Sequence, residues 1–267
     1  MIKKCLFPAA GYGTRFLPAT KAIPKEMLPI LNKPLLQYGV EEALSAGIGN
    51  MAIVTGRGKR SIEDHFDNSF ELESQLSGTS KEYYLDEIKD IIEKSTFSYV
   101  RQQKMLGLGH AILTGEPLIG NEPFAVILAD DLCDCDENGV TSQLIEIYKK
   151  HQCSVIAVEE IPFTSIGRYG VISGDLIDDS TNTYRVTNML EKPNSHDLIE
   201  FSEDGVDLNK APSFMAIIGR YILTPDIFDI LKKIKPSKNG EIQITDALFS
   251  QAKQDKVIAY KFKGKRF

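Results

Sequence analysis

Close to its N-terminus the chain carries a glycine-rich loop that is followed by two cations. Gly11 and Gly13 come soon after an apolar run over residues 2–7, which we expect to be a buried strand. Glycine lets the backbone turn sharply and approach a ligand closely, and successive N–H groups in such a turn form a cradle for an anion. Arg15 and Lys25 add positive charge within reach of the same loop. The strand, the loop and the cations together predict a polyphosphate-binding site.

The spacing of the glycines disfavours two common phosphate-binding motifs. A dinucleotide fingerprint would place its third glycine at the position of Phe16, and a Walker A loop would end in Gly-Lys-Ser or Gly-Lys-Thr. Gly-x-Gly after a strand also fits a tight turn that binds nothing. The loop by itself therefore leaves a ligand site and a plain turn open, and it argues against a dinucleotide-dependent oxidoreductase.

Two further strand ends carry side chains that could bind parts of a nucleotide. Gln102 precedes a glycine-rich segment with Gly107, and its amide can both donate to and accept from the edge of a pyrimidine. Asp130 and Asp131 follow an apolar run over 124–128, and carboxylates at the end of a parallel strand lie where open α/β sheets bind ligands. Mg²⁺ is usually held by one or two carboxylates and substrate phosphates. A surface glutamine and turn-forming aspartates remain the alternatives.

The elements that must position these side chains alternate between strand and helix. Apolar runs predict strands over residues 2–7, 51–54, 97–100, 124–128, 154–158, 215–223 and 257–262. Amphipathic patterns predict helices that begin near Pro34, Ser61, Lys81, Thr141, Pro225 and Gly240. Such alternation with short loops is typical of a parallel sheet under helices. We expect Thr224 to be the N-cap of its helix, and residues 194–212 to form a long loop.

Composition places the chain among ordinary soluble globular proteins and excludes several classes. Of the 267 residues, 42% are hydrophobic and 25% are charged, and the net charge of −6 offers no basic field for nucleic acid. No apolar run has the length of a membrane span, and we see no signal-peptide pattern. The cysteines lack the spacing of a zinc site and fit reduced thiols in the cytoplasm; they are Cys5, Cys133, Cys135 and Cys153.

The full string around the first loop is far more specific than its glycines. Gly-x-Gly-Thr-Arg-x-x-Pro at 11–18, followed by Pro-Lys-Glu-Met-Leu-Pro at 24–29, resembles the signature of sugar-1-phosphate nucleotidylyltransferases. The segment 19–29 is similar to the bacterial branch that uses UTP and glucose 1-phosphate, and the resemblance covers essentially the whole chain. It implies an α/β fold with a Rossmann-like, doubly wound, mixed but mainly parallel sheet and helices on both faces. It also implies Mg²⁺-dependent uridylyl transfer that yields UDP-glucose and pyrophosphate.

The resemblance implies one domain over 1–267, with a nucleotide-binding part over about 1–130 and a sugar-binding part over about 131–267. The residues that match the family's nucleotide site are Ala9, Ala10, Gly11, Gly13, Thr14, Glu26, Gln102 and Gly107. Those that match its sugar site are Gly170, Glu191, Lys192 and Ala216. The cations implied in catalysis are Arg15, Lys25 and Lys192, and Asp130 matches the aspartate that holds the metal.

Two features depart from the family pattern. The branch usually reads Pro-Ser-Asn-Leu-Ala where this chain has Phe214 in place of the asparagine. In the family, a Lys-Gly-Lys segment like that at 263–265 precedes an Asp-x-Gly motif with the second metal ligand, whereas this sequence stops at Phe267. If the protein ends at this residue, we expect Asp130 to hold the metal without that partner. A transferase that prefers dTTP and a non-catalytic homologue that binds a nucleotide sugar stay open. The family's dimers and tetramers imply a homo-oligomer.

Overall fold

The computed structural model describes residues 1–135, 138–194, 197, 214–237 and 239–267. Its described strands form one large sheet, built from β1 (Lys4–Pro8), β4 (Asn50–Thr55), β5 (Thr96–Arg101), β6 (Phe124–Ile127), β8 (Ser154–Ile161), β9 (Gly170–Asp178), β10 (Thr183–Glu191), β11 (Phe214–Leu223) and β12 (Val257–Lys261). Two short pairs lie outside it, β2 (Pro29–Ile30) with β3 (Lys33–Pro34) and β7 (Cys133–Asp134) with β13 (Lys265–Arg266).

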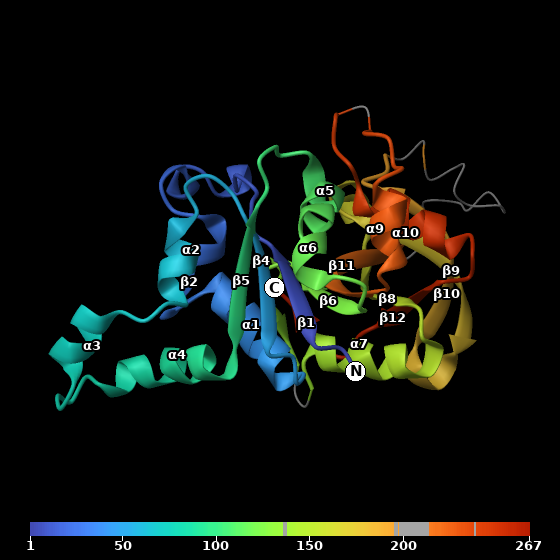
Figure 1. Cartoon of the computed structure of the whole chain (residues 1–267). Helices are drawn as coiled ribbons and strands as arrows, with labels where there is room; N and C mark the ends of the chain where they lie inside the picture. The colour runs from blue at the N-terminus through green and yellow to red at the C-terminus, as the bar shows by residue number, and fades with distance from the viewer. Residues whose placement is uncertain (136–137, 195–196, 198–213, 238) are drawn as a thin grey trace.

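The nine strands follow the order β5-β4-β1-β6-β11-β8-β12-β10-β9 (Figure 1). The strands β5, β4, β1 and β6 are parallel neighbours, and β8 is parallel to β12. The strands β10 and β11 are antiparallel to every partner that they have in the sheet. The other seven strands therefore point in one direction, which confirms the prediction of a mixed, mainly parallel sheet.

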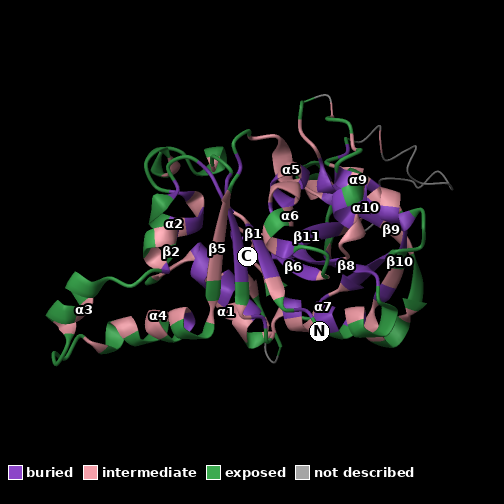
Figure 2. Ribbon diagram, viewed as in Figure 1, coloured by how far each residue is buried: buried purple, intermediate pink, exposed green. Residues whose placement is uncertain are grey.

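Helices cover both faces of this sheet. The described helices are α1 (Leu35–Ser45), α2 (Arg60–His65), α3 (Phe70–Leu76), α4 (Tyr83–Lys94), α5 (Gly107–Thr114), α6 (Glu116–Ile119), α7 (Val140–His151), α9 (Asp226–Leu231) and α10 (Ile244–Ala252); α3 lies away from the sheet (Figure 1). One buried cluster joins the sheet to α1 and α7, and a second joins it to α5, α9 and α10. Figure 2 shows the buried strands between these layers. None of the described helices has the length and apolar character that crossing a membrane would require.

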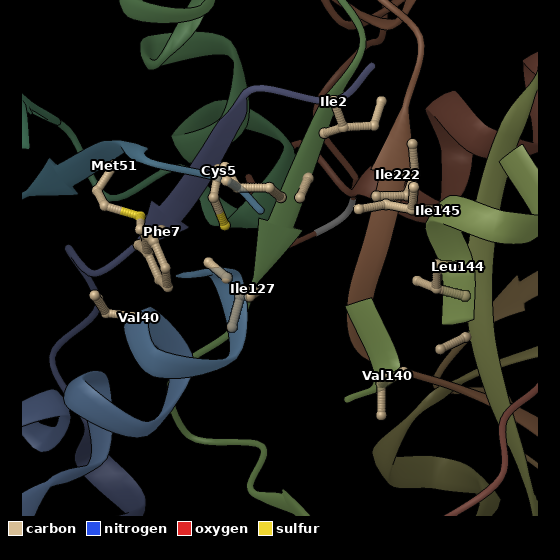
Figure 3. Packing of buried hydrophobic residues seen from close by; sticks show 14 of the residues in the cluster. Ile2, Cys5, Phe7, Val40, Met51, Ile127, Val140, Leu144, Ile145 and Ile222 are labelled. Carbon is tan, nitrogen blue, oxygen red and sulfur yellow. The ribbon is translucent and has the colours of Figure 1, made fainter. Parts of the chain in front are cut away.

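Side-chain alternation along the strands supplies both clusters. In β1, Cys5 and Phe7 belong to the cluster on the side of α1, whereas Leu6 between them belongs to the other. Figure 3 shows Phe7 close to Val40 of α1 and Met51 of β4. A strand that is buried on both faces has to be apolar at every position. This explains why the central strands appear in the sequence as continuous apolar runs.

Several predicted boundaries are wrong. Pro34 is extended and directly precedes the first residue of α1. The last helix begins at Ile244 and not near Gly240; ahead of it, the N–H of Ser237 donates to the carbonyl of Glu241 at 2.8 Å. Thr224 does not cap α9, since Pro225 occupies the cap position. The Thr224 hydroxyl instead accepts from Gln251 Nε2 at 3.0 Å, so a buried tertiary partner replaces the local one. Most of the expected loop over 194–212 lies outside the described residues.

A buried ion pair fixes the segment that leaves β6. Arg220 of β11 donates from Nη2 to Glu42 Oε2 of α1 at 2.8 Å, and from Nη1 to the carbonyl of Leu128 at 3.2 Å. Thr141, at the start of α7, donates its hydroxyl to Glu42 Oε1 at 2.6 Å. Burial acts to raise the pKa of Glu42, but the charge and hydrogen bonds of Arg220 outweigh it and hold this pKa below its ordinary value. The pair therefore ties both helices to the strand end that carries Asp130.

Loss of this pair is expected to destabilise the fold strongly. Glu42→Leu should lower the free energy of unfolding by about 3–5 kcal/mol, because it leaves the guanidinium of Arg220 buried without a counter-charge. Urea unfolding measures the difference. The double variant Glu42→Leu/Arg220→Met should regain part of the loss, since no buried charge is then left alone. A single variant that loses less than about 1 kcal/mol would contradict this account.

Candidate active site

A cavity of about 910 Å³ opens at the carboxyl ends of β1 and β6. Its lining includes the segment 10–16 after β1, Leu128 and Asp130 after β6, and Gln102 directly after β5. The end of β10 reaches the same cavity with Glu191. This is the edge at which open α/β sheets bind their ligands, and it brings together side chains that are far apart in the sequence.

The first glycine loop folds back over the turn that carries Lys25. Gly13 has φ +67°, and a Cβ at this position would lie 2.9 Å from Cβ of Lys25 and 3.2 Å from Cγ2 of Thr20. Thr20 donates its hydroxyl to the carbonyl of Gly13 at 2.8 Å. Ala9, which is predicted to bind the nucleotide, does not line the cavity. Its N–H is already used in a hydrogen bond to the carbonyl of Val54, at 2.8 Å. The backbone N–H groups that could bind a phosphate therefore begin at Ala10.

Two cations of the loop meet the carboxylate of Asp130. Lys25 Nζ lies 2.8 Å from Asp130 Oδ2, and Arg15 Nη2 lies 3.5 Å from the same oxygen. Burial acts to raise the pKa of Asp130, but the charge and hydrogen bond of Lys25, with Arg15 behind them, hold it below its ordinary value. The cavity therefore contains an ionised carboxylate with two cations beside it.

The neighbouring aspartate is bound differently, in a way that the sequence did not predict. Asp131 Oδ1 accepts from Nε and Nη2 of Arg266 at 2.8 and 2.6 Å, and Oδ2 accepts from the N–H of Gly219 at 2.7 Å. The guanidinium of Arg266 also stacks over the ring of Tyr169, 4.7 Å from its centroid. Asp131 is thereby neutralised by a cation 135 residues away. Of these two aspartates, Asp130 is the one that pairs with the loop cations Arg15 and Lys25.

The predicted base-recognition segment lies at another part of the cavity. Gln102 is 4% exposed, and its Nε2 lies 2.8 Å from His110 Nδ1 and donates to the carbonyl of Gly107 at 3.4 Å. Burial and the charge of Lys104 lower the pKa of His110, so its neutral ring can accept this bond. No donor among the described residues bonds to the oxygen of the Gln102 amide, which leaves this oxygen for a ligand. Gly107 has φ +89°, and a Cβ there would come within 3.0 Å of the carbonyl of Ile242.

The predicted sugar site groups Gly170, Glu191 and Lys192 at the paired ends of β9 and β10. Lys192 Nζ lies 3.1 Å from Glu191 Oε1, and the N–H of Lys192 donates to the carbonyl of Tyr169 at 3.0 Å. Glu191 Oε2 accepts from the hydroxyl of Thr245 at 2.8 Å. A carboxylate and a cation are therefore held side by side at the wall of the cavity.

Two other predicted site residues lie outside the cavity lining. Glu26 is fully buried, and its Oε2 pairs with Lys59 Nζ at 2.6 Å. Its Oε1 has no hydrogen-bond partner among the described residues. Burial raises the pKa of Glu26, and the charge of Lys59 offsets this only in part. Ala216 is buried in β11. Phe214, which replaces the family's asparagine, packs near Phe163 with ring centroids 6.1 Å apart and is absent from the lining.

The cavity also contains residues to which the sequence analysis assigned no role. They are Tyr12, Phe16, Met105, Arg168, Tyr169, Tyr221, Gln243, Thr245 and Arg266. They come from six separate segments of the chain, and the fold brings these segments together at the cavity. Among the described residues, no group of three or more His, Cys, Asp or Glu side chains could hold a metal ion. A single carboxylate such as Asp130 still fits Mg²⁺, because substrate phosphates and water supply its remaining ligands.

Comparison with known proteins gives one consistent result. A family model described as "Nucleotidyl transferase" matches residues 6–266. The chain is 59% identical, over 268 residues, to UTP–glucose-1-phosphate uridylyltransferase of Pseudomonas aeruginosa, and the match covers 100% of this chain and 91% of that protein. It is similar to a crystal structure of apo UDP-glucose pyrophosphorylase, with TM-score 0.90, 60% identity and coverage of 100% and 93% of the two chains. A UDP-glucose pyrophosphorylase in complex with UDP-glucose gives TM-score 0.86, 58% identity and coverage of 100% and 93%.

Proposed function

This chain belongs to the nucleotidyl transferase family, and we propose that it transfers the uridylyl group of UTP to glucose 1-phosphate. The products are UDP-glucose and pyrophosphate. The observation that carries the proposal is the single cavity that holds the glycine loop, Gln102, Asp130 and the Glu191–Lys192 pair. Relatives over the whole chain length are named for this reaction, which selects uridylyl transfer over the other transferases.

The reaction joins two anions, so charge has to be neutralised. An oxygen of the sugar phosphate attacks the α-phosphorus of UTP, and the bond from that phosphorus to the pyrophosphate breaks. Positioning and electrostatic stabilisation dominate such transfers. In our proposal, Lys25 neutralises the α-phosphate and Arg15 the leaving pyrophosphate, while N–H groups of the loop after Ala10 hold the phosphates. Lys192 aligns the attacking phosphate.

We propose in addition that Asp130 holds Mg²⁺. Its carboxylate lines the cavity and is kept ionised by the cations beside it, and one carboxylate with substrate phosphates is an ordinary magnesium site. When bound, the ion adds positive charge at the phosphates. Lys25, whose Nζ lies 2.8 Å from Asp130 Oδ2 in this structure, would stand beside the same phosphates.

The base contact assigned to Gln102 follows from its hydrogen bonds. With Nε2 held by His110 and the carbonyl of Gly107, the amide oxygen is free to accept the N3–H of uracil. Gly107 lets the base lie close to the backbone. Thymine presents the same N3–H and adds a methyl group at C5, so the space around that position decides between UTP and dTTP.

Pyrophosphate release tests the function directly. With UTP, glucose 1-phosphate and Mg²⁺ all present, we expect turnover, and we expect none when any one of them is omitted. UTP should be preferred to dTTP. A preference for dTTP would move the chain to the thymidylyl branch. Binding of UDP-glucose without any release would indicate a non-catalytic homologue.

We also propose a homo-oligomer, a dimer or a tetramer, located in the cytoplasm. Exposed apolar side chains on α3 and at the start of α4 support an association surface; they are Phe70, Leu72, Tyr83 and Tyr84. Both helices project away from the central sheet (Figure 1). The four cysteines are free thiols, which suits a reducing compartment. Light scattering should give two or four times the mass of the chain, and a mass equal to one chain would contradict the proposal.

A further inference from the structure

One wall of the cavity has a carboxylate whose orientation is set from another element. Glu191 ends β10, and its Oε2 accepts the hydroxyl hydrogen of Thr245, in the first turn of α10, at 2.8 Å. Its other oxygen, Oε1, lies 3.1 Å from Lys192 Nζ. The two partners are separated by 54 positions in the sequence, so no local motif contains this contact. Because both partners line the cavity, the contact belongs to the binding site itself.

The remaining capacity of this carboxylate suits a sugar. An ionised carboxylate accepts about four hydrogen bonds, and two positions are occupied here by Thr245 and Lys192. The others face a cavity that, in the proposed function, receives a polyhydroxylated substrate. Each sugar hydroxyl donates in one direction, so the rotation of the carboxylate determines which hydroxyls it can accept. A donor that fixes this rotation thereby affects the choice of sugar.

The position of Thr245 is fixed more firmly than that of Lys192. Thr245 is 3% exposed, whereas the side chain of Lys192 is 53% exposed. The methyl group of Thr245 packs against Gly170, where an added Cβ would lie 2.8 Å from Cγ2 of Thr245 and 3.3 Å from Glu191 Oε2. The glycine thus leaves room for both partners. The exposed side chain of Lys192 can move from Glu191 to a phosphate. The hydrogen bond from Thr245 then still fixes the orientation of the Glu191 carboxylate.

We infer that Thr245 is a positioning residue for the sugar half of the site, and that its hydroxyl orients Glu191 to accept the hydroxyl pattern of one hexose 1-phosphate over its epimers. This inference rests on the proposed function. Thr245 does not touch the reacting phosphates in this account. Its effect passes through Glu191, and it concerns the sugar and leaves the nucleotide unaffected.

Two substitutions separate the hydroxyl of Thr245 from its volume. Thr245→Val keeps the shape and removes the donor, and Thr245→Ser keeps the donor and removes the methyl group. For Thr245→Val we expect KM for glucose 1-phosphate to rise about tenfold, the effect of one lost hydrogen bond, with KM for UTP changed by less than about twofold. Thr245→Ser should stay within about threefold of the wild type. The ratio of kcat/KM for glucose 1-phosphate to that for galactose 1-phosphate or mannose 1-phosphate should fall in Thr245→Val and stay unchanged in Thr245→Ser.

A matched control exists elsewhere in the chain. Thr141 is also buried, lies in the first turn of its helix and donates to a glutamate, Glu42 Oε1, at 2.6 Å. Thr141→Val therefore removes the same kind of bond outside the cavity lining. We expect it to lower the thermal midpoint while leaving KM for the sugar phosphate unchanged.

Calorimetry separates this inference from the proposed function. Wild-type turnover tests the function, whereas the affinities for UDP and UDP-glucose test Thr245. The valine variant should bind UDP as the wild type does and UDP-glucose about tenfold more weakly. Equal effects on UDP and UDP-glucose, equal effects of valine and serine, or no effect of valine would each overturn the inference. If Thr245→Val does not fold, Thr245→Ala is compared with Thr245→Ser, because both lack the methyl group and only the serine keeps the hydroxyl.

Discussion

Lys192→Ala is expected to lower kcat/KM for glucose 1-phosphate by about 100- to 1,000-fold, equivalent to about 3–4 kcal/mol of transition-state stabilisation. The ammonium group of Lys192 lies 3.1 Å from Glu191, at the wall of the cavity. In the proposed reaction it leaves that carboxylate to align the attacking phosphate. Without this ammonium group, the two phosphate groups approach each other with one positive charge fewer between them. The decrease in kcat/KM should therefore come mainly from kcat.

The control for Lys192 is a lysine with a similar contact far from the cavity. Lys261 Nζ pairs with Glu160 Oε1 at 2.8 Å, and neither residue lines the cavity. Lys261→Ala should retain activity within about twofold. Lys192→Arg, which keeps the charge, should lose less than the alanine variant. Turnover of Lys192→Ala near that of the wild type would exclude the proposed role.

Asp130→Asn is expected to lower turnover by about 1,000-fold or more, because the proposed magnesium ion is worth several kcal/mol in such transfers. The asparagine keeps the size of the side chain and removes the charge that faces Lys25 at 2.8 Å and Arg15 at 3.5 Å. Activity measured against Mg²⁺ concentration should show that far more metal is required. Thermal unfolding in the absence of substrate would report whether the fold is intact.

A nearby aspartate provides the comparison for Asp130. Asp134 is exposed in the short strand β7 and does not line the cavity, so Asp134→Asn should remain within about twofold of wild-type activity. An Asp130→Asn variant with normal turnover and an unchanged magnesium requirement would refute the proposed metal site. Asp131→Asn should differ from Asp130→Asn and Asp134→Asn. It should weaken the contact that holds Arg266 in place, and it should leave the magnesium concentration needed for activity unchanged.

The cations of the site are already paired before substrate arrives. Lys25 lies against Asp130, Lys192 against Glu191, and Arg266 against Asp131. In the proposed reaction, these contacts hold flexible side chains close to the positions where phosphate charge would develop. Such preorganisation reduces the rearrangement that the reaction itself would require. The three pairs thus place cations at the cavity that we propose to bind phosphate, in a protein whose net charge is −6.

The sequence by itself determined the strands, most helices and the chemistry of the main loop. Apolar runs such as Phe124–Ile127 had to be strands that are buried on both faces. The glycines predicted a tight turn after the first strand, and Gly13 does adopt a positive φ of +67°. Asp130 and Gln102 could be placed at one edge, because the carboxyl ends of parallel strands meet there. All of this information is local, or it follows from the direction of the strands.

Only the tertiary structure decided which side chains meet. Asp131 and Arg266 are 135 residues apart, and no local pattern relates them. Thr224 is a residue type that often caps a helix N-terminus, yet in the folded chain its hydroxyl accepts a hydrogen bond from Gln251. Glu26 belongs to the most specific motif and is nevertheless buried against Lys59. Such contacts depend on strand register and on how helices lie on the sheet, and these follow from the packing of the whole core, which no short stretch of sequence contains.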